Sequence, residues 1–398
     1  MAAHCFDATT FVGPCNHKAR GQHHNPPAPG RSHYLKIKRK QVCNKFFIGM
    51  KRIHTILIIL LLAVTYGEAK KSSDDRQMDD FITSLMKKMT LEEKIGQLNL
   101  GGVGSPKVVG SAIGLDEAIR KGLVSSVGGF DAKAAEDAQK FAVENSRMKI
   151  PLITGLDVVH GYYTIFPIPL ASACSWNMPL LEESARVAAD EASAFGINWT
   201  FAPMVDICRD PRWGRIAEGA GEDPCLGSRI GRAMVRGFQG DDLSKPNTLL
   251  ACVKHFALYG ASEAGRDYNT VSMDPVTMYN YYLPPYKAAF DEGAGSGMTS
   301  FNVVNGVPAT GNKWLLTDLL RDQWKFKGFM VSDANSLAEM SEHGMGGAQR
   351  ITELAMNAGL DMDMSSSLYV LCLKKAVEEK RVPLSRIDAA CRRVLEAK

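Results

Sequence analysis

Short apolar runs alternate with amphipathic stretches along the chain from about residue 97 to its end. The apolar runs are nearly continuous, which is typical of strands in a parallel sheet that is covered on both faces. They lie at 97–102, 124–130, 151–157, 198–204, 250–256, 296–302, 328–333 and 359–364. Helical patterns lie between most of them, as at 131–147 and 179–195. The pattern therefore predicts eight repeated β/α units.

Eight such units fit a (β/α)8 barrel of the TIM type, which usually has about 250 residues and more with insertions. A doubly wound open sheet is the alternative, but no GxGxxG motif follows the first predicted strand. Thr90 and Glu93 have the spacing of a helix capping box just before that strand. We therefore predict an α/β protein whose barrel occupies residues 78–398.

The first 77 residues have a different character. Met50, Lys51 and Arg52 precede the apolar run ILIILLLAV, and small residues follow it, which is the pattern of a secretory signal peptide. The run is too short to span a bilayer, and it lacks the amphipathic pattern of a buried helix. We predict a signal peptide at 50–69, a polar linker at 70–77 and no membrane span in the mature chain. The protein would then be exported, to the periplasm or outside the cell.

Residues 1–49 are rich in His, Cys, Lys and Pro and show no apolar periodicity. A signal peptide that starts at Met50 is out of place behind such a segment. We hypothesise that translation starts at Met50 and that residues 1–49 are an unstructured leader, an artefact of the gene model. N-terminal sequencing of the mature protein tests this, and finding residues 1–49 on it would refute the hypothesis.

The composition, 45% hydrophobic and 23% charged, is that of an ordinary globular protein. The formal charge of +4 comes from the N-terminal segment. Residues 1–69 hold 10 of the 47 Lys and Arg residues but 2 of the 43 Asp and Glu residues, so residues 70–398 carry a net charge of −4. This mildly acidic balance gives no support to a nucleic-acid partner.

Cysteine and histidine are too scattered to indicate a metal site. None of the nine Cys residues belongs to a CxxC motif, and three of the nine His residues lie beyond residue 54: His160, His255 and His343. We therefore expect no structural metal and no cofactor. An exported chain can form disulfides, but the spacing does not assign any pair.

Polar side chains recur at the predicted strand ends, where the active sites of (β/α)8 barrels lie. They are Asp157 and His160 after the third strand, Asp206 and RDPRWGR (209–215) after the fourth, Lys254 and His255 on the fifth, Ser300 and Asn302 (on either side of Phe301) on the sixth, Asp333 on the seventh, and Asp361 and Asp363 on the eighth. One such residue alone, such as Asp333 in VSDANSLAEM, usually caps the following helix. Several strands that end in this way favour a shared polar site.

This set of side chains suits a sugar. Carboxylates and cations both hydrogen-bond hydroxyl groups, and the rings of Trp213, Phe301 and Tyr162 could cover C–H faces. A phosphate suits it less well, because carboxylates repel phosphate and the sequence has no glycine-rich phosphate loop. Lys254 could instead form a Schiff base, as in a barrel aldolase, but the nearby carboxylates would keep its amine protonated.

Four long segments carry a specific resemblance. Residues 151–177 contain GLDVVHG, residues 196–224 contain RDPRWGR, residues 251–271 begin with ACVKHF, and residues 298–336 contain GFMVSD. In this order they resemble the N-terminal barrel of the family 3 glycoside hydrolases, with the greatest similarity to bacterial exported β-glucosidases. The resemblance covers residues 76–398.

The resemblance implies roles at the matching positions. Asp333, at the end of GFMVSD, matches the catalytic nucleophile, and Asp157 matches the carboxylate that holds hydroxyls of the non-reducing-end sugar. The other implied substrate-binding residues are Arg215, Lys254, His255, Phe301 and Glu218, of which Glu218, like its neighbour Glu222, is expected to have a supporting role. The implied substrate is a β-glucoside or an oligosaccharide.

The implied reaction is retaining hydrolysis of terminal non-reducing β-D-glucosyl residues through a glycosyl-enzyme intermediate. A retaining site also needs an acid/base about 5 Å from the nucleophile. Two-domain members of the family take a Glu from a C-terminal α/β sandwich domain, and single-barrel members use a His in the loop after KHF. That loop reads ALYGASEAGRDYN and has no His, although Glu263 could substitute. We therefore expect a truncated chain that lacks the sandwich domain and the acid/base.

Two other functions stay open. One is the same scaffold acting on another sugar, as a β-xylosidase or a related exo-glycosidase. The other is a truncated sugar-binding fragment without turnover. Ala334 also departs from the family, in which many members have a Trp after the nucleophile that stacks on the sugar. The linkage preference therefore stays open.

Overall fold

Eight parallel strands form one sheet in the computed structural model, which describes residues 73–102, 113–128 and 132–398. In chain order the strands are β1 (Asn99–Gly102), β2 (Ser126–Gly128), β3 (Ile153–Leu156), β4 (Trp199–Thr200), β5 (Leu250–Phe256), β6 (Ser296–Thr299), β9 (Phe329–Val331) and β10 (Asp363–Met364). Their order in the sheet is β10-β1-β2-β3-β4-β5-β6-β9. Each lies within one of the eight predicted apolar runs, so the predicted strands are confirmed.

Contacts between the two ends of this sheet close it into a barrel. Val331, the last residue of β9, forms a parallel bridge with Met362, just before β10. The amide of Ser332 donates to the Met362 carbonyl at 2.9 Å, and the amide of Met362 donates to the Met330 carbonyl at 2.9 Å. The predicted (β/α)8 architecture is therefore confirmed.

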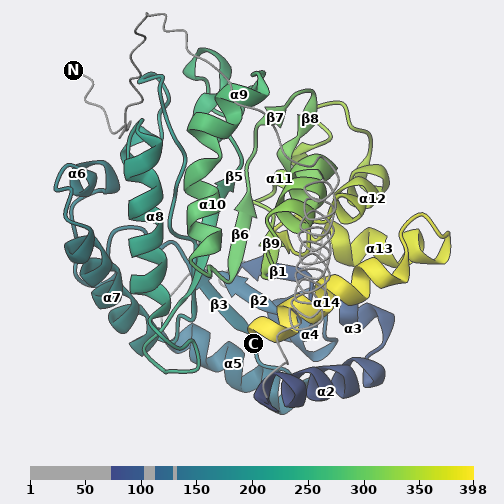
Figure 1. The fold of residues 1–398 in the computed structure, drawn as a ribbon. Helices are drawn as coiled ribbons and strands as arrows, with labels where there is room; N and C mark the ends of the chain where they lie inside the picture. Colours follow the sequence, from purple (N-terminus) through teal and green to yellow (C-terminus); the bar gives the residue numbers. More distant parts are fainter. Residues whose placement is uncertain (1–72, 103–112, 129–131) are drawn as a thin grey trace, which may run out of the picture. The chain divides into compact units, whose positions relative to one another are not determined.

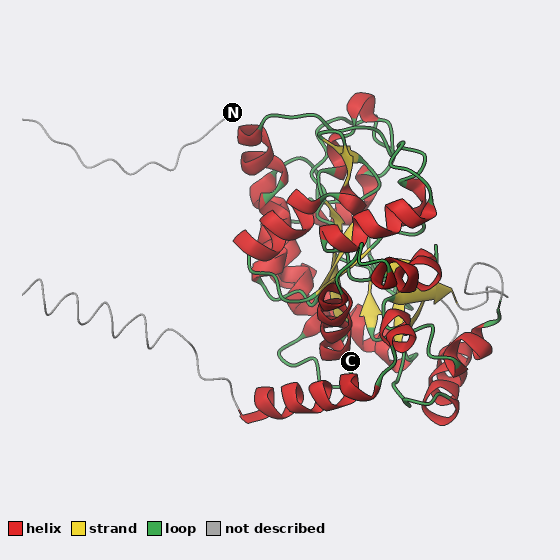
Figure 2. Ribbon diagram, turned by 90° about the vertical axis from the view of Figure 1, so that its right-hand side faces the viewer, coloured by secondary structure: helices red, strands yellow, loops and turns green. Residues whose placement is uncertain are grey.

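Helices surround the strands (Figures 1 and 2). The longer ones are α2 (Ser73–Lys88), α5 (Ala132–Asn145), α7 (Met178–Ala194), α8 (Pro224–Gln239), α10 (Pro284–Asp291), η6 (Trp314–Gln323), α12 (Ala348–Ala358), α13 (Leu368–Glu378) and α14 (Leu384–Ala397). The shorter ones include α3 (Leu91–Gly96), α4 (Leu115–Arg120), α6 (Pro169–Ala173) and α11 (Ser336–Glu339). Helices α5 and α7 match the patterns predicted at 131–147 and 179–195. Within the described ranges, no helix combines the length and apolar character needed to cross a membrane.

Helix α2 corrects the linker that the polar composition predicted at 70–77. The chain is helical from Ser73 onward, and residues 70–72 lie outside the described part, as do the predicted leader and signal peptide. Ile82 and Met86, one turn apart, are buried in the core, and acidic residues begin the helix where they complement its dipole. The predicted capping box is confirmed, because the amide of Glu93 donates to Thr90 Oγ1 at 3.2 Å.

Aromatic rings fill the inside of the barrel. Trp199 on β4 packs edge-on against Phe329 on β9, with ring centroids 5.2 Å apart. Because β5 and β6 separate these two strands in the sheet, the contact must pass through the interior. The indole of Trp199 also donates to Ser296 Oγ at 2.8 Å, so its polar atom is satisfied.

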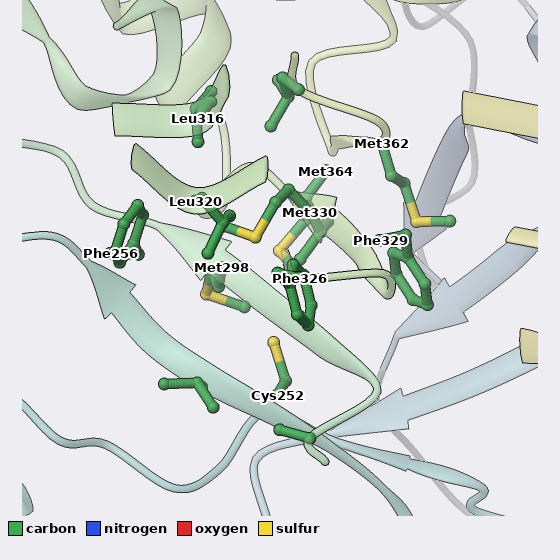
Figure 3. Packing of buried hydrophobic residues seen from close by; sticks show 14 of the residues in the cluster. Cys252, Phe256, Met298, Leu316, Leu320, Phe326, Phe329, Met330, Met362 and Met364 are labelled. Atoms are coloured by element: carbon green, nitrogen blue, oxygen red, sulfur yellow. The ribbon is translucent and has the colours of Figure 1, made fainter. Parts of the chain in front are cut away.

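A second packing layer lies between β9 and helix η6. Figure 3 shows Met330 beside Leu320 of η6. Both side chains are completely buried. The flexible methionine side chain fills irregular space between a twisted sheet and a helix. The described cysteines, at positions 174, 208, 225, 252, 372 and 391, are all unpaired.

A hairpin follows β6 before the chain enters η6. Its strands are β7 (Val303–Val304) and β8 (Val307–Pro308), and the turn residues Asn305 and Gly306 have φ of 49° and 87°. Two positive φ values in succession are typical of a type I′ turn, which Asn-Gly favours. The hairpin also pairs with the loop after β5, since the Val271 amide donates to the Val303 carbonyl at 2.7 Å.

Candidate active site

Two strands bring an ammonium and a carboxylate together at the mouth of the barrel. Lys254, on β5, has a side chain that is only 4% exposed, and its Nζ donates to Asp157 Oδ1 at 2.6 Å. Asp157 follows β3 directly, and its side chain is 62% exposed. The pair therefore joins a buried cation to a carboxylate that a ligand can reach.

Arg215 comes from the loop after β4 and forms a bidentate ion pair with Glu218. Its Nε and Nη2 donate to the two oxygens of that carboxylate at 2.7 and 2.8 Å. Burial acts to raise the pKa of Glu218, but the guanidinium outweighs it and the pKa is lowered. Because both Glu218 oxygens are held, the structure places Glu218 as the partner that orients Arg215. Arg215 Nη2 also lies 3.2 Å from His255 Nε2.

Asp333 follows β9 and is almost completely buried. Its Oδ1 accepts from the amide of Ala334 at 2.6 Å. Its Oδ2 is buried and has no hydrogen-bond partner among the described residues, and it lies 3.6 Å from His255 Nε2. Helix α11 begins at Ser336 with Asn335 at its N-cap position, so the Asp333 carboxylate is not the cap of that helix.

Burial and nearby polar groups act on Asp333 in opposite directions. Burial raises the pKa of Asp333, and His255, the amide of Ala334, Lys254 and Arg215 act to lower it. Burial outweighs them, so the net pKa is above the ordinary value for an aspartate. The structure thus brings five of the predicted residues together: Asp157, Arg215, Lys254, His255 and Asp333.

A buried pair behind His255 was not among the predicted site residues. Asp206, only 2% exposed, lies in the segment after β4 and accepts from both the amide and Nδ1 of His255 at 2.9 Å. The hydroxyl of Tyr286, on α10, is hydrogen-bonded to Asp206 Oδ1. Asp206 was visible in the sequence as a polar strand end, whereas nothing in the sequence linked it to a tyrosine 80 residues later.

Phe301 lies after β6 and contacts a second aromatic ring that the sequence did not reveal. Its centroid is 4.6 Å from the ring of Tyr268, in the loop after β5. Phe301 is buried, while Tyr268 is 46% exposed. Burial raises the pKa of Tyr268, and the charges of Asp267, Glu339 and Asp333 add to this effect. Tyr268 therefore lies near the nucleophile candidate and has a free face.

The eighth strand does not contribute to this site as predicted. Asp361 precedes β10 and accepts from Arg321 Nη2 at 2.6 Å and Arg393 Nη1 at 2.7 Å. Asp363, on β10, accepts from Ser366 Oγ. Both carboxylates are buried and fully used by the fold, so the prediction that they line the mouth is wrong.

One predicted aromatic wall is also wrong. Trp213 is buried, and its indole donates to Asp267 Oδ1 at 3.0 Å, so it has no face for a sugar. Tyr162 is partly exposed and packs against Phe195, with ring centroids 5.3 Å apart, so its contact with a sugar stays a prediction. His160 Nδ1 lies 3.0 Å from the carbonyl of Phe166, which fits a histidine that stabilises its own loop.

Comparison with known proteins decides the family. The family model described as the glycosyl hydrolase family 3 N-terminal domain matches residues 90–397. The chain belongs to this family. The resemblance seen in the sequence motifs is therefore confirmed.

Individual relatives agree. The chain is 43% identical over 326 residues to a periplasmic β-glucosidase of Salmonella typhimurium, covering 80% of this chain and 42% of that protein. It is 32% identical over 358 residues to a putative β-xylosidase of Formosa agariphila, covering 84% and 47%. The crystal structure of a β-glucosidase from Listeria innocua in complex with isofagomine matches with a TM-score of 0.76 and 41% identity, covering 80% and 45%. The chain thus spans less than half the length of these relatives.

Proposed function

We propose that this barrel carries the nucleophile of a retaining β-glucosidase, with Asp333 in that role. One observation carries the proposal: Asp333 Oδ2 is buried without a hydrogen-bond partner among the described residues. A buried acceptor left in this way costs about 1–3 kcal/mol, and each one in a native structure calls for an explanation, such as a catalytic role. An anomeric carbon placed next to Oδ2 would give that oxygen an electrophile to bond.

The reaction follows from the charges around this oxygen. Oδ2 of ionised Asp333 attacks the anomeric carbon, the bond to the leaving-group oxygen breaks, and a glycosyl-enzyme forms that water later cleaves. Arg215 and Lys254 oppose the effect of burial on the Asp333 pKa, so they favour the ionised form that the attack requires. Their fixed positions also avoid reorganisation as charge moves onto the sugar.

The Asp157–Lys254 pair supplies the hydroxyl recognition in this proposal. A carboxylate accepts from hydroxyls and an ammonium donates to them, and the two groups are 2.6 Å apart at the mouth. Such charge-assisted bonds are about twice as strong as neutral ones. The Listeria innocua relative was also solved in complex with glucose, which supports a glucoside as the substrate.

A β-xylosidase is the second candidate, because relatives with that name match most of this chain. A third is a sugar-binding chain without turnover. The ratio of aryl glucoside to aryl xyloside hydrolysis separates the first two. Binding of glucose with no hydrolysis and no covalent adduct would favour the third.

The test of the nucleophile is covalent labelling of the full chain with a 2-fluoro glucoside that has a strongly activated leaving group. Such a leaving group needs little help from a general acid, so the barrel's own chemistry is measured. Peptide mass spectrometry should find the adduct on the peptide that contains Asp333. An adduct on another residue, or no adduct on a folded chain, would overturn the proposal.

We also propose export to the periplasm or the medium. The basic and apolar pattern at 50–69 supports this, as does the periplasmic name of the Salmonella relative. Cell fractionation followed by N-terminal sequencing should give a mature chain that starts after residue 69. A cytoplasmic product that retains residues 50–69 would refute it.

A further inference from the structure

His255 is held from behind by a carboxylate that can only accept hydrogen bonds. Asp206 Oδ2 lies 2.9 Å from both the backbone amide and the ring Nδ1 of His255. Both side chains are buried, at 1% and 0% exposure. The hydroxyl of Tyr286 contacts the other Asp206 oxygen and lies 2.8 Å from the His255 carbonyl. Turning the ring would therefore break its buried hydrogen bond to Asp206.

The other ring nitrogen faces the reaction site. Nε2 is 3.2 Å from Arg215 Nη2 and 3.6 Å from Asp333 Oδ2. A guanidinium can only donate, so the contact with Arg215 requires a lone pair on Nε2. A proton on Nε2 would instead point toward Arg215 or toward the carboxylate of Asp333.

We propose that Asp206 is a positioning residue that keeps the ring proton of His255 on Nδ1, so that Nε2 is an acceptor for Arg215 and leaves Asp333 Oδ2 free to attack. A second group that fixes a histidine tautomer through the far nitrogen is a general device in proteins. Here it explains why Oδ2 has no hydrogen-bond partner although an imidazole nitrogen lies so near. The part concerning attack rests on the proposed function, and the part concerning the proton does not.

The alternative is that Asp206 only ties down the backbone after β5. Its bond to the His255 amide would then be its whole contribution. Because the same oxygen, Oδ2, faces both the amide and Nδ1, no change at Asp206 removes one contact and keeps the other, so the position of the ring proton itself has to be measured. Asp206→Ala removes the acceptor at Nδ1, whereas Asp206→Asn can keep an oxygen there.

The first experiment is long-range proton–nitrogen NMR of the full chain at pH 7 with labelled histidine, assigned with a His255→Gln variant. We expect the His255 signals of the Nδ1–H tautomer in the unmodified protein and in Asp206→Asn, and signals of the Nε2–H tautomer in Asp206→Ala. A neutral Nε2–H ring or a doubly protonated ring in the unmodified protein overturns the proposal, and this result does not depend on the folding of an Asp206 variant. An unchanged tautomer in a folded Asp206→Ala variant overturns it as well.

The second experiment measures the rate of labelling by the activated 2-fluoro glucoside. Loss of the outer partner of a metal-ligating histidine typically costs about 10- to 100-fold, and we expect Asp206→Ala to label more slowly by the same order and Asp206→Asn to recover part of the rate. Asp363→Ala is the matched control, because it removes a buried carboxylate that contacts Ser366 and lies outside the site. Its His255 signals and labelling rate should not change.

The two experiments fail in different ways. If the unmodified chain is never labelled, the proposed function fails while the NMR result still decides the tautomer. If the chain is labelled at equal rates with and without Asp206→Ala, the proposed function stands and the positioning role is refuted.

Discussion

Asp333 and Asp361 are two buried aspartates near β9 and β10, and their surroundings are opposite. Asp361 accepts from two arginines and from the amide of Met330 at 2.8 Å, so both of its oxygens are used. Asp333 accepts from one adjacent amide, and its second oxygen has no hydrogen-bond partner among the described residues. Burial alone therefore does not distinguish a reactive carboxylate from a structural one. The completeness of its hydrogen bonds does.

The cations near the two carboxylates also differ in how strongly they are committed to one aspartate. Arg321, which binds Asp361, is so buried that its pKa is lowered to about 10 even though the carboxylate acts to raise it. That pair is locked into the fold. Around Asp333 the cations Arg215 and Lys254 have other carboxylate partners of their own, Glu218 and Asp157. The charge of Asp333 is thus balanced by the site as a whole and not by one neighbour.

The largest expected effect is on reactivity at Asp333. Asp333→Asn should reduce labelling by the activated 2-fluoro glucoside by about 10⁴-fold or more, as for other nucleophiles, which is about 5.5 kcal/mol of activation free energy. Asp361→Asn should label at the normal rate per folded molecule. Normal labelling of the Asp333 variant would erase the distinction between the two aspartates.

The next largest effect is on stability at Asp361. Asp361→Ala leaves two arginines facing an empty buried position, which should cost about 3–5 kcal/mol of unfolding free energy. Urea denaturation measures this change, and the labelling rate of the folded fraction serves as the control. A loss below about 1 kcal/mol would show that the Asp361 cluster is not structural in the sense argued above.

A smaller stability effect of opposite sign is expected at Asp333. The pKa of Asp333 is raised in the folded state. Above that pKa, the ionised carboxylate lowers the free energy of unfolding. Below the pKa of an unfolded aspartate, both states are protonated and this loss disappears. Asp333→Asn should therefore stabilise the protein by about 1 kcal/mol at pH 7. This gain should vanish toward the lowest pH at which both proteins still unfold cooperatively in urea. A variant less stable than the parent at pH 7 would contradict the assignment of an unsatisfied charge.

The smallest effect tests how far the reactive region extends. Tyr268→Ala removes the half-exposed ring above Phe301 and should weaken binding of an aryl glucoside about fivefold, on the order of 1 kcal/mol. Tyr281→Ala is the control, since Tyr281 is similarly exposed but its ring lies near Arg209. Equal effects of both changes would limit the substrate site to the residues around Asp333.

The sequence predicted the strands well because each has a continuous apolar run, as in Phe329–Val331. It failed for residues 73–77, where a polar composition concealed a helix whose apolar stripe, Ile82 and Met86, begins only later. It also misplaced Asp361, because the predicted strand at 359–364 is longer than β10, which begins at Asp363. Periodicity does not resolve that boundary.

The site itself was predicted only where motif residues supply it. Asp333, Lys254 and His255 lie at strand ends and could be found in this way. The place of Asp206 in the site depends on its contact with Tyr286, which comes from a helix far away in the sequence. Contacts of this kind depend on how α10 packs against β5, and no local pattern in the chain records that packing.

The pairing between the loop after β5 and the hairpin after β6 has a consequence for protein engineering. Val271 is hydrogen-bonded to Val303 and to Asn305 through the backbone. The loop that carries Tyr268 and the hairpin next to Phe301 therefore form one structural unit. Grafting either loop alone from a relative would break these backbone bonds and disturb the contact between the rings of Tyr268 and Phe301. The two segments must be exchanged together. For engineering a new specificity at this edge of the barrel, they therefore count as one part and not as two.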